Sequence, residues 1–95
     1  MKASHRVHAS VYKIPELSMV KAHLIVVVDD MGKLVETLSG PENIGLLVRR
    51  FTQKFAREVV KECVADTFDI EVDADSIELM PYGRLGKMLF KLENK

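Results

Sequence analysis

The sequence is poor in cysteine, in long apolar runs and in net charge, and each shortage excludes a class of protein. Its single cysteine cannot form an internal disulfide, so nothing indicates a secreted domain held together by disulfides. No run approaches the roughly 18 consecutive apolar residues that a membrane-spanning helix needs. No apolar segment near the N-terminus is typical of a signal peptide. We therefore expect a cytoplasmic protein that does not contact a membrane.

The formal net charge is zero, because 14 basic residues balance 14 acidic residues. A neutral chain has no long-range attraction to nucleic acid or to an anionic membrane. Basic and acidic residues are nevertheless segregated along the chain, so a local basic face remains possible. A length of 95 residues, with 47% hydrophobic and 29% charged residues, is typical of one globular domain spanning residues 1–95.

Two stretches of the N-terminal half have the residue patterns of β-strands. Residues 6–12 alternate between apolar and polar side chains, which is typical of a strand with one buried face. Residues 20–28 form the strongest strand pattern, and from Leu24 to Val28 both faces of that strand are apolar. Residues 29–32 have the composition of a turn, and residues 33–38 are expected to return as the second strand of a hairpin.

A single long helix is expected over residues 39–66. Residues 39–42 (Ser-Gly-Pro-Glu) fit a capping box with proline in the first turn, and neither proline nor glycine interrupts residues 46–66. An apolar stripe at helical spacing is expected to pack this helix on the sheet, with Phe51 and Phe55 as its anchors. The stripe consists of Ile44, Leu47, Val48, Phe51, Phe55, Val59 and Cys63.

The C-terminal third returns to the pattern of strands and turns. Residues 77–80 and 87–92 alternate between apolar and other side chains, residues 81–86 are typical of a turn, and residues 68–72 could add a short strand. The order β-β-β-α-β-β predicts an α+β two-layer sandwich, in which a mainly antiparallel sheet of about five strands carries one long helix across one face. A hairpin that leads into one helix, with strands returning after it, loosely resembles the roadblock and longin type of small dimerisation module.

A single helix leaves one face of the predicted sheet uncovered. Leu24, Val26 and Val28 share one face of their strand, whereas Ile25 and Val27 share the other. One helix covers only one of these faces, and a large bare apolar face usually marks a contact site. We therefore expect a homo-oligomer that associates through a sheet face or a sheet edge.

Basic residues form a second stripe on the predicted helix. Arg50, Lys54, Arg57 and Lys61 fall within a sector of about 60°, roughly opposite the apolar stripe. Like charges at this spacing weaken a helix slightly, so helix stability does not explain the stripe. A solvated outer face is the simplest interpretation. The alternatives are binding to an acidic protein surface, such as residues 62–78 of another copy, and binding to nucleic-acid phosphates.

No pattern in the sequence specifies a reaction or a cofactor. Residues 24–30 resemble a Walker B strand, but no phosphate-binding loop accompanies them. Residues 83–86 match the G-x-x-G loop of RNA-binding KH domains, but we interpret them as a hairpin turn because predicted strands flank them. The histidines, Cys63 and the acidic segment lack the spacing of a zinc or calcium site. We therefore expect a non-enzymatic protein-interaction module without metal or cofactor; a nucleic-acid-binding protein that uses the basic stripe is the alternative.

Overall fold

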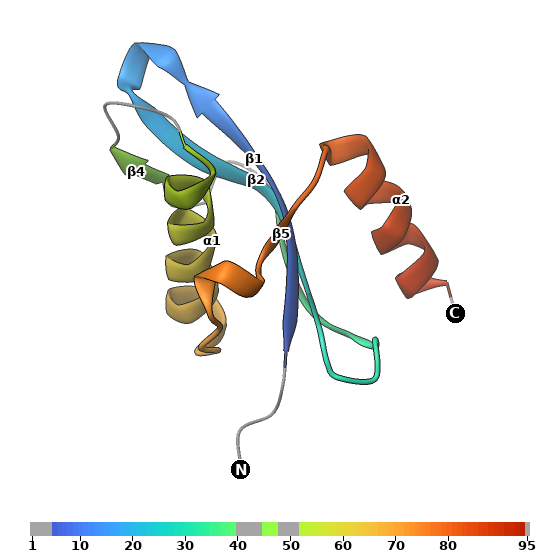
Figure 1. The fold of residues 1–95 in the computed structure, drawn as a ribbon. Helices are drawn as coiled ribbons and strands as arrows, with labels where there is room; N and C mark the ends of the chain where they lie inside the picture. The colour runs from blue at the N-terminus through green and yellow to red at the C-terminus, as the bar shows by residue number, and fades with distance from the viewer. Residues whose placement is uncertain (1–4, 40–44, 48–51, 95) are drawn as a thin grey trace.

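The computed structural model describes residues 5–39, 45–47 and 52–94, which form an α+β fold (Figure 1). Within these residues the strands are β1 (Arg6–Ile14), β2 (Met19–Val28), β3 (Leu34–Ser39), β4 (Gly45–Leu47) and β5 (Glu78–Leu79). The α-helices are α1 (Gln53–Phe68) and α2 (Tyr82–Glu93), and the short 3-10 helices are η1 (Pro15–Leu17) and η2 (Ala74–Ser76). The predicted α+β class is confirmed, and β5 confirms a strand within residues 77–80, whereas the helices and the other C-terminal strands differ from the prediction.

The centre of the sheet is the antiparallel pair of β1 and β2, which confirms the two predicted N-terminal strands. A β-bulge interrupts this pair, because Ser10 pairs with Leu24 whereas Val11 pairs with Ala22. His23 is therefore the extra residue of β2. Its ring stacks on a side chain of α2, so the bulge places an imidazole on the α2 side of the sheet.

The predicted hairpin at residues 29–38 is confirmed, and Asp29 closes its turn. Oδ1 of Asp29 accepts hydrogen bonds from the backbone N–H of Lys33 at 2.8 Å and of Met31 at 2.9 Å. These bonds, that of Lys33 foremost, hold the pKa of the Asp29 carboxyl below its ordinary value because they stabilise the charged form. Gly32 has a φ of 79°, a backbone conformation that residues with a side chain rarely adopt. The turn therefore fixes β3 against β2.

The strand order is β3-β2-β1-β5, and β4 also pairs with β2. β3 and β4 lie end to end along the same edge of β2, because β3 pairs with residues 24–28 and β4 pairs with residues 19–21. β5 lies on the other side of β1 and pairs with it in parallel, opposite His8 and Ala9. This parallel pair departs from the expected antiparallel neighbours, because α1 carries the chain across the sheet to the opposite edge.

The two helices cover opposite faces of the sheet (Figure 1). On the α1 side the buried residues are Val7, Ala9, Val20, Ala22, Ile25, Val27, Ala56, Val59, Val60, Cys63, Val64 and Ile77. On the α2 side the buried residues are Leu24, Val26, Val28 and Leu85. The expected bare apolar face is therefore wrong, because α2 covers it. The described fold has three layers rather than two. Because association through a sheet face was expected only from the bare apolar face, that expectation no longer has support.

The predicted helix over residues 39–66 is wrong in its first half and close to correct at its end. The expected helix start at Ser39 is the end of β3, and the chain forms β4 before α1 begins. The hydroxyl of Thr52 accepts a hydrogen bond from Phe55 N at 3.2 Å, which is the N-terminal cap of α1. Phe55 is 42% exposed, so its expected role as an anchor is also wrong. The other expected anchor, Phe51, lies outside the described residues, as do Ile44 and Val48.

The predicted turn and strand over residues 81–92 are wrong, because this segment is α2. Leu85, Leu89 and Leu92 recur at the spacing of one helix face, and all three pack against the α2 side of the sheet. The alternation that predicted a strand included Phe90, which is 66% exposed. The match to a G-x-x-G loop also fails, since residues 83–86 belong to the helix. Residues 69–73 have no regular secondary structure, so the further short strand is absent there.

Candidate functional site

The structure describes three of the four basic residues that the sequence placed on one helical stripe, and all three are on α1. Lys54 and Lys61 are exposed on α1, whereas Arg50 lies outside the described residues. Arg57 is half-buried: its Nε donates to the carbonyl of Ile77 at 3.3 Å and its Nη2 donates to Gln53 Oε1 at 3.4 Å. Arg57 therefore ties α1 to the segment before β5. In the described part of α1 the predicted stripe therefore consists of two exposed lysines, with the engaged Arg57 between them.

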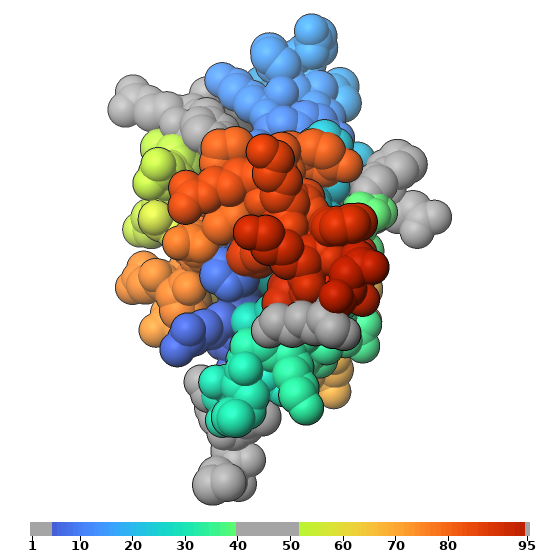
Figure 2. Space-filling view, turned by 90° about the vertical axis from the view of Figure 1, so that its right-hand side faces the viewer, coloured from blue at the N-terminus to red at the C-terminus, as the bar shows by residue number. Residues whose placement is uncertain are grey.

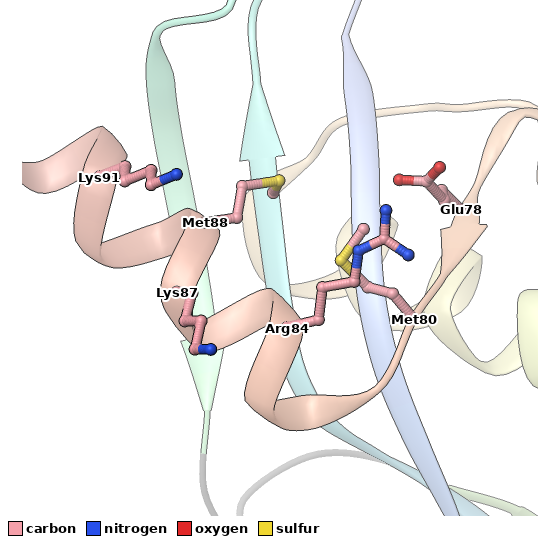
Figure 3. A pocket seen from close by; sticks show the side chains of 6 residues that line it. All are labelled: Glu78, Met80, Arg84, Lys87, Met88 and Lys91. Carbon is pink, nitrogen blue, oxygen red and sulfur yellow. The ribbon is translucent and has the colours of Figure 1, made fainter.

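A second group of cations lies on α2, and the sequence interpretation missed it. Arg84, Lys87 and Lys91 follow one another at three and four residues, which places them within about 60° of the helix circumference. They line a cavity of about 410 Å³ together with Met80, Met88 and Glu78 (Figure 3). We call this cavity the α2 groove. It combines three cations on one side with two thioether side chains.

The charges of the α2 groove are unbalanced. Glu78 is the one acidic residue that lines the groove, and its Oε1 lies within hydrogen-bond distance of His8 Nδ1, at 2.8 Å. Arg84, Lys87 and Lys91 have no ion-pair partner among the described residues. The groove therefore presents a local positive potential, although the whole chain has zero net charge.

Lys91 lies in the last turn of α2, where a cation favours the helix, but two other features of these cations oppose the stability of α2. A cation in the first turn of a helix opposes the helix dipole, and Arg84 is in that turn. Lys87 and Lys91 are like charges four residues apart, which weakens a helix by a few tenths of a kcal/mol. Figure 2 faces the α2 side of the molecule and shows that α2 covers the middle of the sheet, with the first residues of β1 visible beside it. All three cations of the groove are exposed.

A second cavity, of about 490 Å³, lies at the start of α2 and is lined by aromatic side chains. The His23 ring stacks on Tyr82, with ring centroids 3.9 Å apart and planes inclined by 13°. Tyr12 meets the same imidazole edge-on, at 5.5 Å and 70°. We call these three residues the aromatic array. Ser10 lines the same cavity and is only 5% exposed.

Neither cavity contains an arrangement that specifies a reaction. Within the described ranges, no group of three or more His, Cys, Asp and Glu side chains is placed to hold a metal ion. Cys63 is buried in the core on the α1 side. In the same part of the chain, no helix has the length and the apolar character to cross a membrane.

The α2 groove could have been found in the sequence only through the helix that carries it. The leucine spacing at residues 85, 89 and 92 was the available signal. A strand over residues 87–92 placed Lys87 and Lys91 on one face but left Arg84 in the preceding turn, so the three cations were not grouped. Comparisons of the chain with protein-family models, with curated proteins and with solved structures found no match.

Proposed function

We propose that this protein is a small non-enzymatic interaction module whose α2 groove binds an acidic segment of a partner protein. The observation that carries the proposal is the set of three cations on α2 that lack ion-pair partners among the described residues and line a cavity containing methionines. An acidic partner supplies the missing negative charge. The α2 groove replaces the α1 stripe as the candidate site, because Arg57 of that stripe is engaged in hydrogen bonds to the chain itself.

The chemistry of the α2 groove favours a segment that has both carboxylates and apolar side chains. Arg84 offers a planar guanidinium that pairs with a carboxylate through two hydrogen bonds, and the lysines add charge without fixed geometry. Met80 and Met88 are flexible and polarisable, so they can adapt to apolar side chains of different shape. Alternating acidic and apolar residues in the partner would match this mixed lining.

A protein segment fits the groove better than nucleic acid does. Nucleic-acid binding draws on long-range attraction, which a chain of zero net charge lacks. Single-stranded nucleic acid also needs aromatic side chains on which bases stack, and the groove has methionines in those places.

The test is a fluorescence-anisotropy titration with a labelled peptide of alternating glutamate and leucine residues. The combined changes Arg84→Glu, Lys87→Glu and Lys91→Glu should weaken binding by at least about tenfold, because each exposed ion pair contributes up to about 1 kcal/mol. The matched control is Lys54→Glu with Lys61→Glu on α1, which should change the affinity by less than about twofold. Equal losses in both variants would show nonspecific charge attraction and would contradict the proposal. So would low-micromolar binding of DNA, dependent on the α2 cations, at about 150 mM salt.

The proposed module also associates with itself, and the remaining route is a sheet edge. β3 pairs with β2 on one side, and no described strand pairs with its other side. The carbonyl of Ala9 accepts a hydrogen bond from Met80, which follows β5, so the backbone groups of Ala9 point away from β2. Backbone groups alternate along a strand, so those of His8 point toward its partner Val26 on β2. The backbone groups of Val26 therefore face β1, and those of Val27 face β3. The residue opposite Val27 is Glu36, so the next residue, Thr37, directs its N–H outward. Two copies can therefore pair their β3 strands and continue the sheet.

Light scattering at tens of micromolar protein should report twice the chain mass of 10.7 kDa. Thr37→Pro removes one outward N–H without removing a bond to β2, so this variant should shift the species toward the monomer. Thr37→Ala keeps the N–H and should remain a dimer. A monomer for the unmodified chain at these concentrations would refute the dimer.

A further inference from the structure

Among the residues that the structure describes, none pairs with the outer edge of β1 beyond Ala9. β5 pairs with β1 only at His8 and Ala9, and the last backbone bond to this edge runs from Met80 N to the carbonyl of Ala9 at 2.9 Å. Pro81 then turns the chain away to begin α2. No described strand pairs with β1 on this side from residue 10 to residue 14.

The open edge presents backbone donors and acceptors in a regular row. Successive residues of a strand direct their N–H and C=O groups to alternate sides. Because the groups of Ala9 face β5, those of Val11 and Lys13 face the same open side. No hydrogen bond from another described residue occupies them there. Tyr12, between them, directs its backbone groups to β2. The row is therefore a template for one more strand, in line with β5.

Side chains of both helices stand beside this edge. The aromatic cavity is lined by Val11 and Tyr12 of β1, by Gln53 at the start of α1 and by Tyr82 at the start of α2. These elements come from opposite faces of the sheet, so the open edge lies in a recess between them. A single extended chain fits such a recess, whereas the edge of a second folded sheet would meet the two helices.

We propose that the edge of β1 at Val11 and Lys13 binds an extended, uncharged peptide segment of a partner protein, which adds a strand to the sheet. The backbone of the segment would pair with the open groups of β1, and one aromatic side chain would enter the cavity beside the aromatic array. No Asp, Glu, Lys or Arg lines the cavity, so charge complementarity selects an uncharged side chain. The exposed rings of Tyr12 and Tyr82 offer stacking and edge contacts to an aromatic ring.

This site differs from the α2 groove in chemistry and in location. Met80 is the one residue that lines both cavities, and the three cations of the groove do not line the aromatic cavity. The two proposals can therefore be tested separately: absence of binding at one site does not contradict binding at the other.

Amide hydrogen exchange measured by NMR tests the edge directly. In the free protein the amides of Val11 and Lys13 should exchange at least about tenfold faster than those of Ser10 and Tyr12, which face β2. Addition of the blocked pentapeptide Thr-Tyr-Thr-Val-Thr at millimolar concentration should slow the exchange of Val11 and Lys13 selectively. The same peptide with every backbone nitrogen methylated lacks the donors of a strand and should have no effect.

Three variants separate strand addition from other modes of binding. Lys13→Pro removes an open N–H and should weaken pentapeptide binding at least about fivefold, whereas Lys13→Ala keeps the N–H and should change it less than twofold. Tyr82→Ala should weaken it about threefold or more, since this exposed ring is outside the buried core. Unchanged exchange of Val11 and Lys13 at saturating peptide would overturn the proposal. Equal affinities of Lys13→Pro and Lys13→Ala for the pentapeptide would also overturn it. So would a mass measurement in which Lys13→Pro, but not Lys13→Ala, dissociates a dimer, because the β1 edge would then be a contact between two copies.

Discussion

Replacement of Leu85 by alanine is expected to lower the free energy of unfolding by about 2–5 kcal/mol. Leu85 is 0% exposed and is the one fully buried side chain of α2. It lies against Leu24, Val26 and Val28, so its loss leaves a cavity between α2 and the sheet. A domain of this size has a total stability of about 5–15 kcal/mol, so the change removes a large fraction of it.

Urea denaturation followed by circular dichroism measures this loss, and Phe90→Ala is the matched control. Phe90 belongs to the same helix but is 66% exposed, so its replacement should cost about 0.5 kcal/mol or less. If Leu85→Ala cost no more than Phe90→Ala, residues 82–93 would not pack on the sheet as described.

Replacement of Ile25 by alanine is expected to cost a similar amount, about 2–5 kcal/mol, from the other face of the sheet. Ile25 is 0% exposed in the middle of β2 and belongs to the core under α1, which is built mainly from valines and alanines. Valine and alanine side chains have little freedom to fill the space that the lost methyl groups leave. The loss in free energy of unfolding should therefore include most of the contribution from the cavity that the substitution leaves.

Phe55→Ala is the control for this second prediction. Phe55 is on α1 but 42% exposed, so its replacement should cost less than about 1 kcal/mol, in contrast to its expected role as an anchor. Ile25 and Leu85 belong to separate cores, so their costs should add to within about 0.5 kcal/mol in the double variant. A cost of Phe55→Ala equal to that of Ile25→Ala would contradict the assignment of the α1 core.

The strands of the N-terminal half could be predicted because their signals agree. In β1 the alternation of apolar residues matches the buried positions Val7 and Ala9. In β2 the apolar run from Leu24 to Val28 indicated burial on both faces, and both faces are buried. The turn at Asp29 has the composition that its hydrogen bonds require. Local sequence and tertiary packing favour the same structure in this region.

The helices were predicted less well because local signals there support two structures. The motif at residues 39–42 satisfies the rule for a helix start, yet β3 ends at Ser39 and α1 begins with the cap at Thr52. Pairing of β4 with β2 takes residues 45–47 into the sheet, and such non-local pairing is not encoded in spacing. At residues 85–92, apolar residues recur at both strand and helix spacing, and packing on the free sheet face selects the helix.

The misassigned helix also explains why the candidate site moved. With residues 81–92 predicted as a turn and a strand, Arg84 was in the turn and apart from Lys87 and Lys91, so the predicted helix over residues 39–66 offered the only stripe of several cations. The prediction of an acidic protein partner remains, but its proposed site is now the α2 groove. The prediction of a bare apolar face was wrong for the same reason, because residues 82–93 form the helix that covers this face.

The position of α2 over the second sheet face is the central claim, because both the α2 groove and the aromatic cavity depend on it. The most direct measurement is a set of nuclear Overhauser contacts between the methyl groups of Leu85 and those of Leu24, Val26 and Val28, recorded with the backbone chemical shifts. We predict such contacts together with helical Cα shifts throughout residues 82–93. Extended-type shifts over residues 87–92, with no contact between Leu85 and β2, would contradict the account.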